Sequence, residues 1–151
     1  MAHLYYTIDI NAPKEKVWHT MLDPDTYKQW TSAFHEGSYY EGSWDKGSRI
    51  RFVSEEDDGQ TGISGEIAEN IPYEYVSTKI MAVIVDGQDD STSESVQKWI
   101  GSYENYRFSE KDGVTTVDIE MTGDSMDAEA QEIFEDMWPK GLAKLKTIVE
   151  Q

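Results

Sequence analysis

Residues 127–150 read DAEAQEIFEDMWPKGLAKLKTIVE and contain the strongest periodic pattern in the chain. Apolar residues recur there at spacings of three and four, which is typical of a helix with one buried face. They are Ala130, Ile133, Phe134, Met137, Trp138, Leu142, Leu145, Ile148 and Val149. Acidic side chains gather at the start and lysines in the second half, as the helix dipole favours. We expect one helix of about 36 Å, at 1.5 Å per residue, lying across a sheet.

The chain before this segment consists mostly of predicted β-strands. Alternating apolar residues predict a first strand over residues 3–10, and two short helices follow, one capped by Asn11 and one over residues 25–30. Further strands are expected near residues 37–44, 48–54, 61–69, 73–85, 95–108 and 114–122. Their connections are short and rich in Gly and Asp, so neighbouring strands should be antiparallel. This order of elements indicates an α+β fold.

The composition restricts the possible partners. Thirteen Lys and Arg against 30 Asp and Glu give a net charge of −17. Such a charge repels phosphate groups, which excludes non-specific binding to nucleic acid and disfavours anionic membrane surfaces. Two interpretations of the acidic surface stay open: a solvated surface that favours solubility, and a docking surface for a basic protein.

Several classes of site and location can be set aside. The chain has no cysteine, which removes disulfides, thiolate zinc sites and cysteine nucleophiles. Its start has no signal-type segment, and its longest apolar run, residues 80–85, is too short to span a bilayer. We therefore expect a cytoplasmic protein with one domain over residues 1–151, no membrane insertion, and a monomeric or weakly homodimeric state.

Candidate catalytic and metal-binding groups are sparse. His3, His19 and His35 are scattered and show neither His-x-x-x-His nor Glu-x-x-His spacing. The glycines match no phosphate-binding or dinucleotide fingerprint, and no Gly-x-Ser-x-Gly elbow marks a hydrolase. Glu66 and Glu104 are the candidates for an inward-facing carboxylate, with an ordinary surface position as the favoured alternative for each, because glutamate generally stays exposed. We predict no metal, no cofactor and no catalytic residue.

Two longer motifs and one turn carry a family resemblance. Residues 10–30, INAPKEKVWHTMLDPDTYKQW, form the first motif; Trp138, Leu142, Leu145 and Val149 form the second; residues 113–117 form the turn. Together they resemble the START-like (SRPBCC) helix-grip superfamily, in the branch similar to the activator of the ninety-kilodalton heat-shock protein ATPase. The resemblance implies a curved antiparallel sheet of about seven strands wrapped around the long C-terminal helix. It also implies two short helices between strands 1 and 2, and an apolar cavity between sheet and helix.

The closing helix departs from the pattern of this superfamily. A glycine commonly precedes its tryptophan, whereas Met137 stands there in this chain. Pro139 and Gly141 lie inside the predicted helix, where proline costs about 3 kcal/mol and glycine about 1 kcal/mol. We expect a kink or bulge near residues 136–138, with the helix continuing after it. These departures should decide the size of the cavity.

Aromatic and aliphatic side chains are the candidates to line this cavity, with plain core packing as the alternative for each. The candidate ligand-binding residues are Trp30, Phe34, Phe52, Ile63, Ile80, Trp99, Tyr103, Phe134, Met137 and Trp138.

Three functions are therefore in competition. The first is non-catalytic binding of a small hydrophobic or amphipathic ligand, which agrees with the aromatic residues and the missing catalytic motifs. The second is interaction with a chaperone or another basic protein, which the resemblance implies. The third is a cyclase- or hydrolase-like enzyme, which an acid with perturbed titration facing the pocket would favour.

Overall fold

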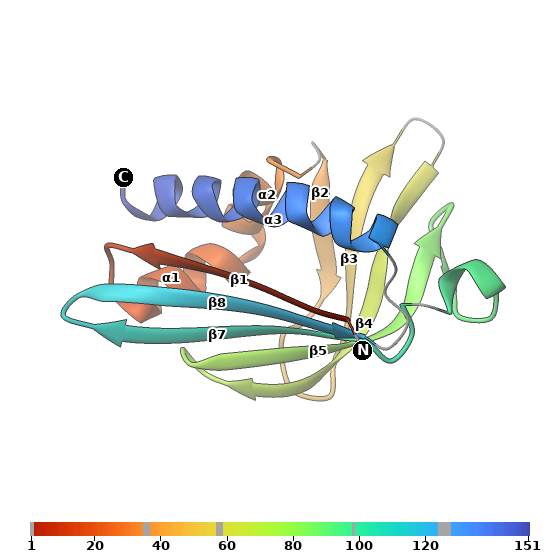
Figure 1. Ribbon diagram of the computed structural model, residues 1–151, viewed down its shortest axis with the longest axis horizontal. Helices are drawn as coiled ribbons and strands as arrows, with labels where there is room; N and C mark the ends of the chain where they lie inside the picture. Colours follow the sequence, from red (N-terminus) through yellow and green to blue (C-terminus); the bar gives the residue numbers. More distant parts are fainter. Residues whose placement is uncertain (1, 35–36, 57–58, 98, 124–127) are drawn as a thin grey trace.

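The computed structural model describes residues 2–34, 37–56, 59–97, 99–123 and 128–151 (Figure 1). The chain begins with a strand, two short helices and two strands: β1 (Ala2–Ile10), α1 (Lys14–Leu22), α2 (Pro24–Thr31), β2 (Ser38–Gly42) and β3 (Arg49–Glu56). It continues with β4 (Gly59–Ile71), β5 (Tyr75–Val85), β6 (Gln88–Asp90), a 3₁₀ turn η1 (Glu94–Val96), β7 (Tyr103–Lys111), β8 (Val114–Gly123) and α3 (Ala128–Val149).

The strands form a single antiparallel sheet in the order β1-β8-β7-β5-β4-β3-β2, and the short β6 pairs with β5. The sheet curls around α3, which packs against β1, α1 and α2 (Figure 1). This arrangement confirms the predicted α+β helix-grip fold. The sheet has eight strands instead of about seven because the acidic loop after β5 contributes β6.

The core lies between the concave face of the sheet and the helices. Its fully buried side chains come from the first motif, the strands and α3 alike: Ile10, Val17, Met21, Trp30, Ile50, Ile67, Val76, Val117, Ile119 and Leu145. A buried hydrogen bond of 2.7 Å from the Thr115 hydroxyl to the Ala12 carbonyl joins β8 to the chain that leads into α1. Each large side chain contributes about 1.5–3 kcal/mol through burial, so the motif residues are needed for the fold itself.

The strand predicted over residues 95–108 is wrong at its start, because β7 begins at Tyr103. The preceding segment is a polar turn. The Asp90 carboxylate accepts hydrogen bonds from the backbone N–H groups of Thr92 and Ser93, at 3.1 and 3.0 Å, and η1 follows. Side-chain acceptors of this kind replace the ladder partners of a strand and favour a turn.

Asn11 does not cap the first helix, contrary to the prediction. Helix α1 begins at Lys14, and Pro13 is its N-cap residue, without a side-chain cap bond. The Asn11 backbone N–H donates instead to a carboxylate oxygen of Glu150 at 2.9 Å, and the Lys146 ammonium donates to the Asp9 carbonyl at 2.8 Å. These bonds tie the end of β1 to the last turn of α3.

Helix α3 continues past Pro139, which lies on its exposed side, and ends one residue before the predicted limit. The bend expected at residues 136–138 stays a prediction. Gly141 faces the core, and a Cβ added there would lie 2.1 Å from Cε1 of Phe34. The interior glycine thus lets the Phe34 ring pack directly on the helix backbone.

Candidate functional site

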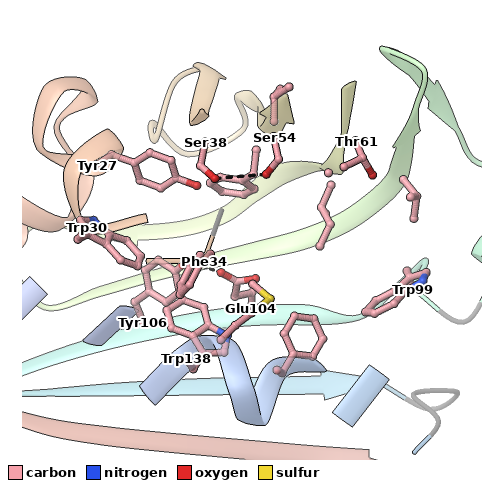
Figure 2. Close-up of a pocket in the computed structure, with 17 residues that line it drawn as sticks. Tyr27, Trp30, Phe34, Ser38, Ser54, Thr61, Trp99, Glu104, Tyr106 and Trp138 are labelled. Carbon is pink, nitrogen blue, oxygen red and sulfur yellow. Dashed lines mark hydrogen bonds between the residues drawn. The ribbon is translucent and has the colours of Figure 1, made fainter. Parts of the chain in front are cut away.

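A pocket of about 480 Å³ lies between α2, the sheet and α3 (Figure 2). Its wall is mostly aromatic and aliphatic, with a few hydroxyl groups and one carboxyl group. The residues that line it are Tyr27, Trp30, Phe34, Ser38, Phe52, Val53, Ser54, Thr61, Gly62, Ile63, Val83, Trp99, Glu104, Tyr106, Phe134, Met137 and Trp138.

One end of the pocket is walled by aromatic rings from two helices and a strand. Phe34 packs edge-to-face against Trp30 and against Trp138, each with ring centroids 5.4 Å apart. Tyr106, on β7, packs edge-to-face on Trp138 at 5.8 Å. The indole N–H of Trp30 donates to the Met21 carbonyl at 3.0 Å. Because each ring is held by others, this end of the pocket is preformed.

Three hydroxyl-bearing residues lie along the opposite wall. Ser38, Ser54 and Thr61 occupy matching register positions on β2, β3 and β4, and the two serine hydroxyls are 3.3 Å apart (Figure 2). At a further point of the wall, Trp99 and Phe134 form an edge-to-face pair at 5.6 Å. The pocket is therefore apolar overall, with a short polar row that could orient a ligand.

Glu104 is the only acidic or basic side chain among the described residues that line the pocket. It lies on β7 two residues before Tyr106, so both side chains point to the same face of the sheet, and the Tyr106 hydroxyl donates a hydrogen bond to its Oε1. Burial raises the pKa of the Glu104 carboxyl to about 7, and the bond from Tyr106 opposes this shift. Burial, followed by the charge of Glu104, also raises the pKa of Tyr27 on α2.

The structure brings together eight of the ten candidate residues named from the sequence: Trp30, Phe34, Phe52, Ile63, Trp99, Phe134, Met137 and Trp138. Ile80 is buried on β5 opposite Gly65 and lies outside the wall. Tyr103 precedes Glu104 on β7 and therefore points to the other face. Whether the eight residues contact a ligand stays a prediction.

The two acids considered from the sequence as inward candidates have different positions. Glu104 lines the pocket. Glu66 pairs in register with Arg49 and Lys79, next to the buried Ile67 on β4, and therefore lies on the opposite face of the sheet. The contributions of Tyr27, Val53, Gly62, Val83 and Tyr106, and of the three hydroxyl residues, were not recognised from the sequence. A period of two from Glu104 would have identified Tyr106.

Met137 occupies the position where glycine is common in the superfamily, and it lines the pocket half-buried. We expect Met137→Ala to enlarge the pocket and to strengthen binding of a bulky uncharged dye severalfold. Partial burial should hold the loss of stability to about 1–2 kcal/mol, below the range for fully buried methionines. Dye titration and urea denaturation measure the two effects. Met81→Ala, half-buried on β5 away from the pocket, is the matched control, and equal dye binding by both variants would contradict the expectation.

In the part of the chain that the structure describes, no group of three or more His, Cys, Asp or Glu side chains could hold a metal ion. No helix among the same residues is long and apolar enough to cross a membrane. His35 lies outside the described residues.

A sheet gripping a long closing helix, with two short helices after the first strand, defines a helix-grip protein of the START-like class. Residues 11–150 match the family model described as Activator of Hsp90 ATPase homolog 1-like protein, and the chain belongs to this family. A comparison with curated proteins found no match.

Solved structures with a similar fold come from several bacteria. Protein MLL2253 from Mesorhizobium loti is 15% identical with a TM-score of 0.72, over 99% of this chain and 97% of that chain. Protein NE0264 from Nitrosomonas europaea is 13% identical with a TM-score of 0.75, over 99% and 94% of the two chains. The Aha1 dimer from Colwellia psychrerythraea is 19% identical with a TM-score of 0.67, over 99% and 97%. At these identities the likeness concerns the fold alone.

Proposed function

We propose that this protein binds a small hydrophobic or amphipathic molecule in the pocket between the sheet and α3, without catalysing a reaction on it. The observation that carries the proposal is the pocket of about 480 Å³ with its aromatic wall. Ligand pockets commonly measure about 300–1,000 Å³ and combine apolar side chains with a few polar groups. A wall of interlocked rings loses little conformational entropy when a ligand enters, which favours affinity.

Titration with an uncharged environment-sensitive dye tests this proposal. We expect saturable binding with one dye per chain and a blue shift of its emission. Ile63→Trp should fill the pocket and weaken dye binding at least about tenfold, which corresponds to 1.4 kcal/mol. Ile71→Trp, at an exposed position on the same strand, is the matched control and should bind the dye like the wild type. Dye binding that Ile63→Trp leaves unchanged would contradict the proposal.

Native mass spectrometry of protein purified from its own host complements the dye. A co-purifying small molecule that is absent from Ile63→Trp would identify the natural ligand. The same spectra report the oligomeric state, for which we propose a monomer or weak homodimer formed by the single domain over residues 1–151.

Interaction with a chaperone is the second candidate, and family membership is the observation that favours it. The net charge of −17 would steer a basic surface towards the protein. A pull-down with the ninety-kilodalton chaperone, followed by an assay of its ATPase, tests this candidate. Absence of both capture and stimulation would exclude it.

An enzyme would use Glu104, because a carboxyl group with a pKa of about 7 suits general acid–base catalysis. This side chain is the perturbed acid that favours the third candidate function. A proton donor alone defines no reaction, and we assign Glu104 to ligand binding. Turnover of a bound ligand that Glu104→Gln abolishes would contradict the non-catalytic proposal.

A further inference from the structure

Only one of the two carboxylate oxygens of Glu104 accepts a hydrogen bond from a described residue. Tyr106 donates to Oε1, and Oε2 has no hydrogen-bond partner within the described ranges of the chain. Figure 2 shows the carboxylate directed into the pocket beside Phe34 and Trp138. A half-buried carboxylate with an unused acceptor is stabilised when a donor or a positive charge reaches it. None of the described residues that line the pocket is basic, so no side chain there supplies that positive charge.

Aromatic rings border the same carboxylate. Phe34 and Tyr106 each pack on Trp138 at this end of the pocket, and ring faces attract organic cations. A carboxylate beside aromatic rings therefore offers an ammonium group both a counter-charge and cation–π contacts. An anionic ligand, such as a fatty acid, would meet repulsion from Glu104 and from the net charge of −17.

We infer that the pocket selects a flat aromatic amine, with its ammonium group on the Glu104 carboxylate and its apolar body between the rings of the wall. This inference rests on the proposed ligand binding and specifies the class of ligand. The hydroxyl row of Ser38, Ser54 and Thr61 on the opposite wall suits a ligand with a second polar group far from the amine. The negative field of the whole protein raises the local concentration of such cations.

The groups that face Glu104 carry no charge near neutral pH, so ionisation of Glu104 itself controls binding of the amine. Tyr106 is on the same strand and Tyr27 is on α2, and burial keeps the pKa of each hydroxyl raised, so both stay neutral. Across the sheet, Glu104 pairs with Met121 on β8 and Thr78 on β5, which carry no charge. Amine affinity should therefore increase as Glu104 ionises between about pH 6 and about pH 8.

Three naphthalene probes of equal shape test the inference: 2-naphthylmethylamine, 2-naphthylmethanol and 2-naphthoate. Calorimetric titrations with the wild type should show the amine binding at least about tenfold more tightly than the alcohol, the gain expected from one charge-assisted hydrogen bond, and the carboxylate weakest. Glu104→Gln should bind the amine and the alcohol about equally and should lose the pH dependence. Glu66→Gln makes the same change in net charge outside the pocket and should retain the preference.

The possible results separate the inference from the proposed function. Equal binding of amine and alcohol to the wild type, or an amine affinity that Glu104→Gln leaves unchanged, overturns the inference and leaves ligand binding standing. Loss of the preference in Glu66→Gln as well would assign the effect to net charge and also overturn it. Binding of none of the three probes overturns both.

Discussion

Replacing Gly141 with alanine is expected to lower the free energy of unfolding by about 1–2 kcal/mol. The new Cβ would lie 2.1 Å from Cε1 and 2.6 Å from Cζ of Phe34, so the ring or the helix must shift. Overpacking of this kind costs about 1–3 kcal/mol, and it opposes a gain of up to about 1 kcal/mol from the better helix propensity of alanine. Urea denaturation followed by circular dichroism measures the net effect.

A double-mutant cycle with Phe34→Ala isolates this contact. In the Phe34→Ala background, Gly141→Ala should be neutral or stabilising, because the ring that it would strike is gone and only the helix propensity remains. Dye binding should fall in the single Gly141→Ala variant, since the displaced ring moves along the wall of the pocket. A Gly141→Ala protein more stable than the wild type would show that the ring does not pack closely on the helix.

Replacing Glu104 with glutamine is expected to stabilise the protein at about pH 8.5 and to have a much smaller effect at about pH 5. The pKa of this carboxyl is about 7 in the folded protein, against 4.5 as its ordinary value. As the pH rises from 4.5 to 7, the unfolded chain has already released the proton that the folded protein still binds, so the stability of the wild type falls. Above about pH 8 the loss is constant, on the order of 3 kcal/mol. Glutamine can still accept the bond from Tyr106 and carries no charge to bury.

The measurement is urea denaturation of wild type and variant at several pH values between these limits. The difference in unfolding free energy should grow with pH for Glu104→Gln. Glu66→Gln, which removes the same charge on the other face of the sheet, is the matched control. A difference that does not change with pH for Glu104→Gln would mean that this carboxyl titrates normally in the folded protein.

Local periodicity explains why the closing helix was predicted within one residue of its observed end. A spacing of three and four depends only on the helix itself, and Leu142, Leu145 and Val149 are buried as that spacing requires. The start of β7 was not predictable in the same way. Residues 90–97 are polar except for Val96, and the Asp90 carboxylate accepts hydrogen bonds from the backbone N–H groups two and three residues further on. Such short-range hydrogen bonds compete with a strand and leave no periodic signal.

The sequence of a single strand does not determine which of its residues line the pocket. Tyr103 and Glu104 were both candidates for the inward face, yet neighbours on a regular strand point to opposite faces. Only the pairing of β7 with β8 decides between them. The register shift between Ser64 and Gly65, where β4 meets β5, similarly interrupts the alternation of facing positions along that pair. The aromatic residues of the helices were easier to identify, because α3 and α2 each present a continuous face.

The pairing of β1 with β8 has a consequence for how the protein is made. Strand β1 is synthesised first, but its partner residues are more than 100 positions further along the chain. Closing a loop of this length is entropically unfavourable until the intervening strands are formed, and such distant pairings slow folding. During translation β1 therefore has no strand partner, and its alternating apolar side chains stay uncovered, while the meander from β2 to β8 assembles. The sheet can be completed only after residues 114–123 have left the ribosome, and until then β1 is open to pairing with other nascent chains.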